Sequence, residues 1–292
     1  MSHQAGFVSI IGKPNAGKST LMNALVGEKM SIITPKAQTT RHRILGIVNT
    51  DDYQIVFSDT PGVIKPHYAL HESMMHQVDG SIVDADLILL VTDIYEEYDE
   101  TDVLKKLEGS LAPVAVLINK IDQSDEETVK KKVEFWQEKL NPKAIFAISA
   151  LHDHNIKAVM DFVIGNLPEH PAYYAKDALT DRNDRFFASE MIRAQILKQY
   201  KKEIPYSAEV IVTAFVEGET LHRISAEIIV ERDSQKNIII GEGGKMLKIV
   251  GTYARRDMED FFQKKVFLEM FVKVIPDWRS KKNYLKKFGY EG

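Results

Sequence analysis

An apolar run, Phe7–Ile11, stops at Gly12, and a helical pattern resumes at Lys18 after a few small or helix-averse residues. The segment Gly12–Ser19 reads GKPNAGKS and matches G-x-x-x-x-G-K-[ST] between a predicted strand and a predicted helix. Glycines there let backbone N–H groups turn inward, and the first turn of a helix adds unpaired donors and a positive dipole end. A glycine turn that merely links strand to helix is the alternative, but it does not require the whole pattern. We therefore predict a phosphate-binding loop.

Short apolar runs alternate with helical patterns through the first half of the chain. Continuous apolar runs are typical of strands that are buried on both faces of a parallel sheet. Between them lie patterns such as residues 129–140, where apolar side chains recur at helical spacing. The alternation predicts a doubly wound α/β domain with right-handed crossovers. The predicted strands are Phe7–Ile11, Gln54–Ser58, Asp86–Asp93, Val114–Asn119 and Ala144–Ser149, with His42–Asn49 as an extra strand at the sheet edge.

A second, smaller domain is expected after a predicted helix at Ile156–Leu167. Prolines then break the chain, and a polar segment follows. We expect a first domain over residues 1–170, a linker over 171–183 and a second domain over 184–292. The second domain has an α+β order, and its elements are predicted as helix Phe186–Tyr200, strands Ser207–Val216 and Arg223–Arg232, a helix after the sequence GEGGK, a longer helix Val250–Gln263 and strand Val266–Val274.

Composition limits the class of protein. The chain has 292 residues, of which 44% are hydrophobic and 27% charged, as in soluble globular proteins of two domains. It has no Cys, which excludes a disulfide framework and a thiolate metal site and suits a reducing compartment. No apolar run approaches the roughly 20 residues of a membrane-spanning helix, and the first residues do not resemble a signal peptide. We expect a cytoplasmic location.

Charge is distributed unevenly. The whole chain carries −4, yet residues 177–292 contain 21 Lys and Arg against 18 Asp and Glu. The last stretch, SKKNYLKKFGYEG, places Lys beside aromatic residues. Such a pattern is compatible with nucleic-acid binding or with a solvated surface.

The nucleotide base is indicated by Asn119-Lys120-Ile121-Asp122, which follows a predicted strand. The Asp122 carboxylate can accept from two adjacent N–H donors, which guanine offers, whereas adenine would present an acceptor to it. Lys120 would lay its stem along the base, and Asn119 would tie this segment to the phosphate loop. Ser149-Ala150, after another strand, would offer a backbone N–H to the guanine oxygen. We therefore predict GTP and GDP as ligands.

A metal site and a switch are predicted around the phosphates. Lys18 is expected to reach the β- and γ-phosphates, and the Ser19 hydroxyl to ligate Mg²⁺. In Asp59-Thr60-Pro61-Gly62, Asp59 would hold Mg²⁺ through a water and the Gly62 N–H would sense the γ-phosphate. Thr39 or Thr40 could add a second hydroxyl ligand, and Thr40 is preferred. Loops around Thr40 and after Gly62 would be ordered by GTP and released after hydrolysis.

The segments GKPNAGKS, QTT, DTPG, NKID and SA, in this order and spacing, resemble those of the translation-factor-related GTPases. Almost the whole chain is similar to the Era family of bacterial ribosome-assembly GTPases. The resemblance implies a Ras-like P-loop GTPase domain followed by a type II KH domain that binds RNA. It also implies coupling of GTP binding and hydrolysis to 16S ribosomal RNA, near its 3′ end, during assembly and maturation of the small (30S) subunit.

The predicted GTP-binding residues are Gly12, Lys13, Pro14, Asn15, Ala16, Gly17, Lys18, Ser19, Thr20, Asp59, Thr60, Pro61, Gly62, Val63, Asn119, Lys120, Ile121, Asp122, Ser149 and Ala150. Ras-like enzymes often place a glutamine directly after the switch glycine to orient the attacking water, and here that position is Val63. We therefore expect slow intrinsic hydrolysis and assign no catalytic side chain. Asn15 resembles the asparagine with which some members of this class hold K⁺, and we hypothesise that role for it.

The second domain contains a G-x-x-G loop, Gly241–Gly244, ahead of a basic helical stretch. In KH domains such a loop clamps about four nucleotides of single-stranded RNA, although a turn without a ligand is the alternative reading of four residues. The segment Ile238–Ile240 before it reads as a strand end or a helix end. Glu242 departs from the basic residue usual in this loop, and Arg256 among other cations could compensate. The candidate RNA-binding residues are Gly241, Gly243, Gly244, Lys245, Lys248 and Arg255.

Two other functions stay open at this point. The chain could be an RNA-binding module gated by nucleotide occupancy, with hydrolysis incidental, and the absence of a glutamine at Val63 favours that alternative. The basic tail could instead contact the inner face of the cell membrane peripherally. We expect a monomer.

Overall fold

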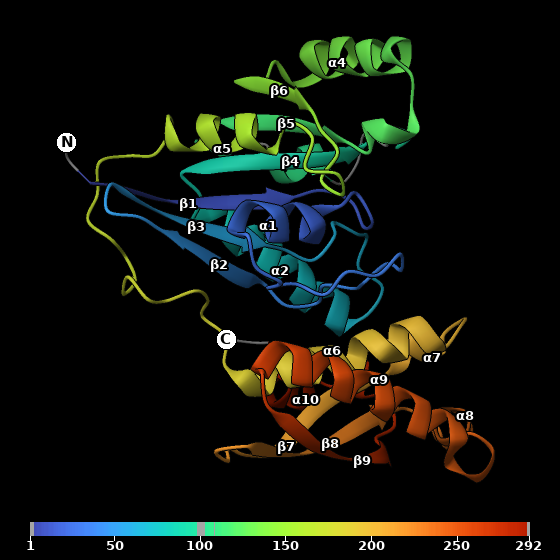
Figure 1. The fold of residues 1–292 in the computed structure, drawn as a ribbon. Coiled ribbons are helices and arrows are strands. Elements are labelled where there is room, and N and C mark those ends of the chain that lie inside the picture. Colours follow the sequence, from blue (N-terminus) through green and yellow to red (C-terminus); the bar gives the residue numbers. More distant parts are fainter. Residues whose placement is uncertain (1–2, 98–102, 108, 291–292) are drawn as a thin grey trace. The chain divides into compact units, whose positions relative to one another are not determined.

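The computed structural model describes residues 3–97, 103–107 and 109–290 (Figure 1). They form two compact units: the first contains the described residues up to His67 and from His71 to Asp181, and the second contains Tyr68–Leu70 and the described residues from Arg182 onward. The outer limits expected for the two domains, residues 1 and 292, lie outside the described residues. Among the described helices, none is long and apolar enough to cross a membrane.

The first unit is built on a six-stranded sheet with the order β2-β3-β1-β4-β5-β6. All neighbouring strands are parallel except β2 and β3, so His42–Asn49 is indeed an added edge strand. The strand after Lys143 is shorter than predicted, because it ends at Ala147 rather than Ser149. The strands are β1 (Gln4–Ile11), β2 (Ile44–Asn49), β3 (Tyr53–Asp59), β4 (Leu87–Asp93), β5 (Val114–Asn119) and β6 (Ala144–Ala147).

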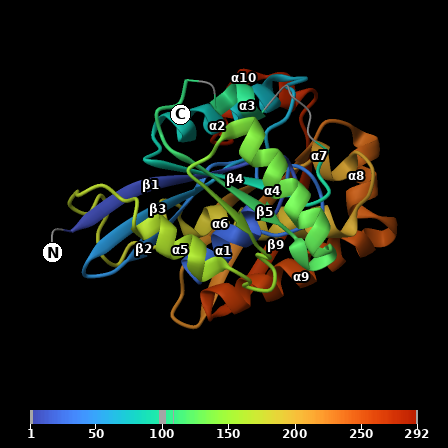
Figure 2. The ribbon, with the colours of Figure 1, turned by 90° about the horizontal axis from the view of Figure 1, so that it is seen from above.

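Helices cover both faces of this sheet (Figure 2). The main core lies between the sheet and two helices, α1 and α5, whose apolar side chains pack against β1, β3, β4 and β5. The strand order changes direction beside β1, and ligands of open α/β sheets bind at the carboxyl ends of strands at such a point. The helices are α1 (Lys18–Val26), α2 (Ala69–Val83), α3 (Val103–Leu107), α4 (Glu126–Leu140) and α5 (Ile156–Ile164), with a 3₁₀ turn at Ile121–Gln123.

The predicted linker differs from the structure. Most of residues 171–183 belong to the first unit, where they run along the exposed edge of β2. The N–H of Ile47 donates to Leu179 O at 2.9 Å, and the N–H of Leu45 donates to Asp181 Oδ1 at 3.1 Å. An uncovered edge strand presents unpaired backbone groups, and this segment supplies partners for them. The polar, proline-rich composition predicted the break in the chain but gave no sign of this packing.

The second unit has a three-stranded sheet, β7 (Glu209–Val216), β8 (Leu221–Val230) and β9 (Lys265–Val274), in that order. Strand β8 pairs antiparallel with β7 and parallel with β9. The core of the second unit lies between this sheet and the helices. It includes buried side chains of α6 and α9. The helices are α6 (Asp184–Gln199), α7 (Ile204–Ser207), α8 (Asp233–Ile240), α9 (Lys245–Phe262) and α10 (Lys282–Lys287), with 3₁₀ turns at Glu242–Gly244 and Trp278–Ser280.

In this unit the structure decides one open alternative and corrects one prediction. A helix, α8, separates β8 from the glycine loop, so Ile238–Ile240 is a helix end rather than a strand end. The two helices expected after GEGGK are one continuous helix, α9. It continues through Gly251, where a Cβ would lie 2.8 Å from Met270 Cε, so glycine at this position lets α9 pack closely on β9.

Candidate functional site

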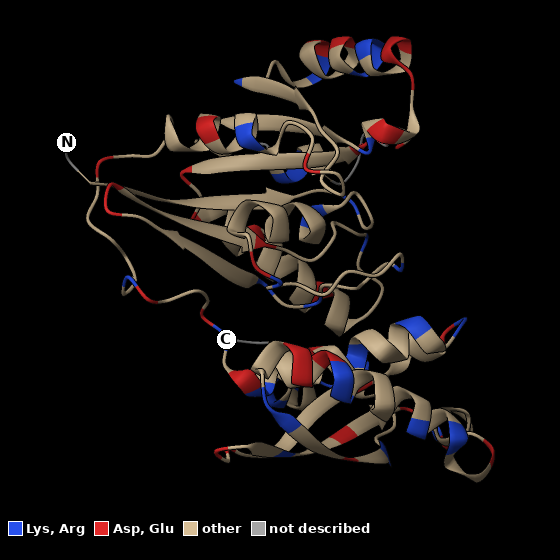
Figure 3. Ribbon diagram, viewed as in Figure 1, with Lys and Arg blue, Asp and Glu red and all other residues tan. Residues whose placement is uncertain are grey.

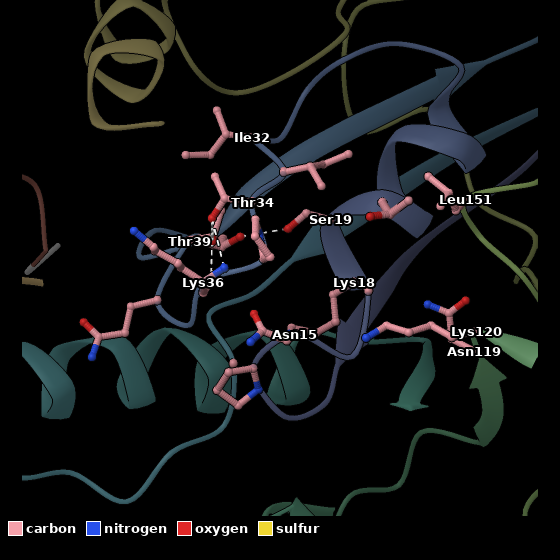
Figure 4. Close-up of a pocket in the computed structure, with 18 of the residues that line it drawn as sticks. Asn15, Lys18, Ser19, Ile32, Thr34, Lys36, Thr39, Asn119, Lys120 and Leu151 are labelled. Carbon is pink, nitrogen blue, oxygen red and sulfur yellow. Dashed lines mark hydrogen bonds between the residues drawn. The ribbon is translucent and has the colours of Figure 1, made fainter. Parts of the chain in front are cut away.

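The phosphate loop joins β1 to α1 and approaches two neighbouring strands closely (Figure 4). Gly12 has φ +151°, and a Cβ on it would lie 2.1 Å from Val91 O at the end of β4. Gly17 has φ +100°, and a Cβ on it would lie 2.1 Å from Asn119 Nδ2. Only glycine fits at either position, because both the backbone conformation and the space exclude a side chain. The motif therefore sets the distance between the loop and the ends of β4 and β5.

Lys18 is buried at the first position of α1 and donates from Nζ to Lys13 O at 2.8 Å. Burial lowers the pKa of this lysine to about 8, although the carboxylates of Asp59 and Glu96 act in the opposite direction. The hydrogen bond holds the amine within the loop. A phosphate would replace the water that burial removes and would favour the charged form.

Three oxygen-bearing side chains meet beside the phosphate loop. Ser19 Oγ donates to Asp59 Oδ2 at 2.7 Å and lies 2.8 Å from Thr40 Oγ1. Burial raises the pKa of Asp59, while the charge of Lys18 lowers it. Asp59 Oδ1 is buried and makes no hydrogen bond among the described residues. A hard cation with oxygen ligands would satisfy that atom, so this donor set fits Mg²⁺.

The structure separates the two candidate threonines. Thr40 Oγ1 lies 3.4 Å from Asp59 Oδ2, within the same cluster. Thr39 Oγ1 instead donates to Lys36 O at 2.6 Å and lies 2.7 Å from Thr34 Oγ1. Thr39 therefore stabilises the loop before it, and Thr40 is the hydroxyl available to a metal.

At the other end of the site, Asn119 connects three loops. Its Nδ2 donates to Ala16 O in the phosphate loop at 2.8 Å, and its Oδ1 accepts from the N–H of Ala150 at 3.0 Å. Asp122 Oδ1 accepts from Ser149 Oγ at 2.5 Å. These bonds fix the acidic side chain relative to the phosphate loop, so one ligand can contact both.

A cavity of about 540 Å³ lies between these groups. Figure 4 shows Asn119, Lys120 and Leu151 toward one end and Thr34, Lys36 and Thr39 toward the other. Its size is that of a small-ligand site. The predicted residues that line it are Pro14, Asn15, Gly17, Lys18, Ser19, Thr20, Thr40, Gly62, Asn119, Lys120, Asp122 and Ser149.

Other predicted residues support the cavity without lining it. Val63 is 3% exposed, and its N–H donates to Gly12 O at 3.0 Å, so its side chain belongs to the core. Thr60 Oγ1 donates to Ile10 O at 2.8 Å. The predicted residues outside the lining are Gly12, Lys13, Ala16, Asp59, Thr60, Pro61, Val63, Ile121 and Ala150.

Sequence reasoning missed part of the lining. Gln123 and Leu151 directly follow predicted segments, and that adjacency was the available signal. Gln38 and Thr39 belong to the segment QTT, whereas residues 32–36 before it carry no motif, so their role could not be predicted from the chain. The missed residues are Ile32, Ile33, Thr34, Pro35, Lys36, Gln38, Gln123 and Leu151, and Thr39, which had been weighed only as a metal ligand, also lines the cavity.

The second unit offers a different kind of site at its glycine loop. Gly241, Gly243 and Gly244 all have positive φ, and a Cβ on Gly241 would lie 2.7 Å from Met246 Cγ. A Cβ on Gly243 or Gly244 would meet nothing within 4 Å. One side of the loop therefore packs on α9, and the other leaves its backbone accessible.

A groove of about 400 Å³ follows the loop along α9 and β9. It combines the cations Lys248 and Arg255 with an apolar floor, and Lys and Arg recur along α9 (Figure 3). Of the predicted RNA-binding residues, Gly244, Lys248 and Arg255 line this groove, whereas Gly241, Gly243 and Lys245 do not. The other lining residues are Leu247, Gly251, Thr252, Leu268 and Met270.

Comparison with known proteins places both units. A family model described as a 50S ribosome-binding GTPase matches residues 7–120, and a KH domain model matches residues 203–279. The chain is 42% identical over 291 residues to GTPase Era of Staphylococcus haemolyticus, covering 99% of this chain and 97% of that one. It is 40% identical over 291 residues to GTPase Era of Clostridium botulinum, covering 99% of each.

Two solved structures match the whole fold, each with a TM-score of 0.93 and 37% identity. One is Era in complex with MgGDPNP and nucleotides 1506–1542 of 16S ribosomal RNA, and the match covers 99% of both chains. The other is a variant of Aquifex aeolicus Era bound to GDP and AlF4⁻, covering 98% of this chain and 99% of that one. These matches confirm the predicted Ras-like GTPase domain followed by a KH domain.

Proposed function

Because the chain belongs to the Era family of GTPases, we propose that GTP binding and hydrolysis in its first unit control binding of 16S ribosomal RNA by its second unit. The RNA segment is the 3′ end of that molecule, and the process served is assembly of the 30S subunit. One observation carries the proposal: Asn119 ties the phosphate loop to the segments of Asp122 and Ala150 around a single cavity.

In the first unit, each end of the cavity has a separate task. The amine of Lys18 and the N–H groups at the start of α1 bind the phosphates. The Asp122 carboxylate accepts from the guanine edge, for which adenine has no matching pair of donors. Ser19 and Thr40 would hold Mg²⁺ directly and Asp59 through a water; when bound, Mg²⁺ neutralises charge on the phosphates.

Hydrolysis in this site uses no glutamine after Gly62. The buried Val63 cannot orient water, so the intrinsic rate is slow and backbone groups or a partner place the water. Asn15 lines the cavity from within the phosphate loop, and its side chain is the proposed K⁺ ligand. Equal hydrolysis rates in sodium and potassium buffers would remove that role.

In the second unit, the accessible glycine loop receives the RNA backbone, and the apolar floor of the groove receives bases. Lys248 and Arg255 attract the phosphates, and their charge offsets the carboxylate of Glu242 at the loop. A relative of the same fold has been solved with nucleotides 1506–1542 of 16S ribosomal RNA, which supports this choice of ligand.

The decisive experiment measures two quantities on the purified full chain. One is the affinity for an RNA oligonucleotide from the 3′ end of 16S ribosomal RNA, with a GTP analogue and with GDP. The other is GTP turnover with and without that RNA or 30S particles. Tighter RNA binding with the GTP analogue, together with stimulated turnover, is the expected result. Equal affinity in both nucleotide states and unstimulated turnover would refute the coupling.

Gated binding without stimulated turnover would instead identify the nucleotide-gated RNA-binding module. The basic tail presents exposed Lys281, Lys282, Lys286 and Lys287, and co-sedimentation with anionic vesicles tests the peripheral membrane contact. Light scattering tests the expected monomer, and the cytoplasmic location stays a prediction.

A further inference from the structure

Lys120 holds an unusual backbone conformation at the edge of the nucleotide cavity. Its φ is +66°, in the left-handed region that side chains other than glycine rarely adopt. It precedes the 3₁₀ turn Ile121–Gln123, which carries the base-reading Asp122. Its side chain is 30% exposed and lines the cavity, yet its ammonium is already paired: Nζ lies 2.5 Å from Asp93 Oδ2.

Asp93 is built to accept that ammonium. It is the last residue of β4 and stands beside Asn119 in the sheet register. Its Oδ1 accepts from the N–H of Tyr95 at 2.9 Å, which leaves Oδ2 aimed at Lys120. The Asp93 side chain is 23% exposed, so water screens this pair less than it would a fully exposed one.

The residues after Asp93 also hold the segment of Lys120 and Asp122, here called the base loop, at two further points. The N–H of Ile94 donates to Asn119 O at 3.0 Å, and the Tyr95 hydroxyl donates to Gln123 O. The end of β4 and the two residues after it thus contact Asn119, Lys120 and Gln123. Asp93, Ile94 and Tyr95 belong to no nucleotide motif, and Asp93 does not line the cavity.

We propose that Asp93 is a positioning residue for the guanine base and acts through Lys120. By holding the ammonium, it fixes the four-carbon stem of Lys120 as an apolar wall of the cavity on which the base lies. Without this partner, the long side chain would populate several rotamers, and ordering it would oppose nucleotide binding. This inference rests on the proposed guanine site.

The test is a double-mutant cycle on the full chain, with GDP affinity measured by calorimetry for wild type, Asp93→Asn, Lys120→Ala and the double variant. Asparagine has the shape of aspartate and keeps an acceptor for Tyr95, but it turns an amide NH₂ toward Lys120. We expect Asp93→Asn to weaken GDP binding about tenfold in the wild-type background and not to weaken it further when Lys120 is Ala. Asp79→Asn, which removes an ion pair with Lys106 outside the cavity, should change nothing.

A second measurement, the ratio of GDP to IDP affinity, distinguishes a residue that positions the base from one that hydrogen-bonds to it. IDP lacks the 2-amino group that Asp122 accepts from, so Asp122→Asn should change the ratio of GDP to IDP affinity. Asp93→Asn should weaken both nucleotides alike and leave that ratio unchanged. Melting temperatures of the ligand-free Asp93→Asn and Asp79→Asn proteins show whether either variant unfolds the site.

The outcomes that overturn the inference are distinct. Unchanged GDP affinity in Asp93→Asn refutes it, and so does an equal loss in the presence and absence of the Lys120 side chain. If wild type itself fails to bind GDP, the proposed function fails and the inference fails with it.

Discussion

The two candidate sites of this molecule are built on opposite plans. In the nucleotide cavity, polar side chains such as Asn119 are buried and hydrogen-bonded within the protein; Asn119 bonds to the backbone of Ala16 and Ala150. At the candidate groove of the second unit, Gly243 and Gly244 in the adjoining loop leave open space, and the polar groups are the accessible backbone and nearby cations. The first site would select its ligand by fixed donors and acceptors. The second would bind the sugar-phosphate backbone of a nucleic acid, so most of its selectivity would come from contacts to the bases.

The two sites differ in the free-energy penalty for binding a wrong ligand. A fixed carboxylate that a bound base covers loses its partners when the base is wrong, and unpaired polar groups are expensive to bury. Cations beside an open groove interact with any phosphate chain and are screened by salt. Substitutions in the cavity should therefore change selectivity, and substitutions at the groove should change overall affinity.

The largest effect is expected from Asp122→Asn, which tests selectivity directly. GTP affinity should fall about 100-fold, because two charge-assisted hydrogen bonds to guanine are lost. XTP affinity should rise, because the amide can donate to the xanthine oxygen. Nucleotide titrations measure both. Asp125→Asn, at the exposed N-cap of α4, is the matched control and should bind GTP as wild type does. Equal affinity of wild type for ATP and GTP would contradict this account of the cavity.

Gly244→Asp should cause the next largest effect, on the other side of the comparison. A carboxylate at the accessible face of the loop repels the RNA phosphates, so RNA affinity should fall about tenfold or more while GTP hydrolysis is unchanged. Filter binding and turnover assays measure the two. Gly27→Asp has a similar φ of +80° and open surroundings in the first unit, and it controls for backbone strain. Loss of both activities, or of neither, would argue against separate sites.

Val63→Ala should lower stability without changing catalysis. The side chain is buried, and removing two methyl groups should cost about 1.5 kcal/mol in the free energy of unfolding. The turnover number should change less than about twofold, because Val63 lies outside the cavity lining. Urea unfolding and single-turnover assays test the two statements. A tenfold lower rate at unchanged stability would place Val63 in the hydrolytic machinery.

Tyr200→Phe should have the smallest effect, and that effect should depend on pH. Tyr200 donates to Ile239 O at 2.6 Å, at the end of α8 just before the glycine loop. Burial raises the pKa of this phenol to about 12, above its ordinary value of 10. The stabilisation is therefore complete below pH 10 and is lost as pH rises from 10 to 12.

We expect the variant to be less stable than wild type by about 1 kcal/mol at pH 8, with the difference nearly gone at pH 11. Urea unfolding followed at Trp278, with Trp136 replaced by Phe in both proteins, measures it in the second unit. The same difference at both pH values would show that the hydroxyl is not held neutral in the folded state.

The parts of the molecule that could be predicted from the sequence are those where the local structure admits only particular residue types. The phosphate loop needs glycine at Gly12 and Gly17 for space and conformation, and such requirements leave a pattern in the chain. Asn119 and Asp122 follow a strand whose apolar run is unmistakable. Chemistry that depends on particular residue types at fixed spacing can therefore be predicted without a structure.

The parts that were missed depend on packing between distant segments. The apolar residues Ile238–Ile240 suit a strand end or a helix end, and only the surrounding unit makes them the end of α8. The loop before Thr40 lines the cavity by its position and not by its residue types. Asp93 is the last residue of an ordinary buried strand, and nothing in the chain connects it with Lys120 across 27 positions.

The packing of residues 173–181 along β2 shortens the chain segment that connects the two units. Asp181 is bonded to Leu45, and Asn183 already caps α6 by accepting from the N–H of Phe186. Only Arg182 lies between the residue that is bonded to β2 and the residue that caps α6, so the connection between the two units is short. Because β2 starts four residues after Thr40, the strand that holds this connection also continues directly from the loop that carries the candidate metal ligand.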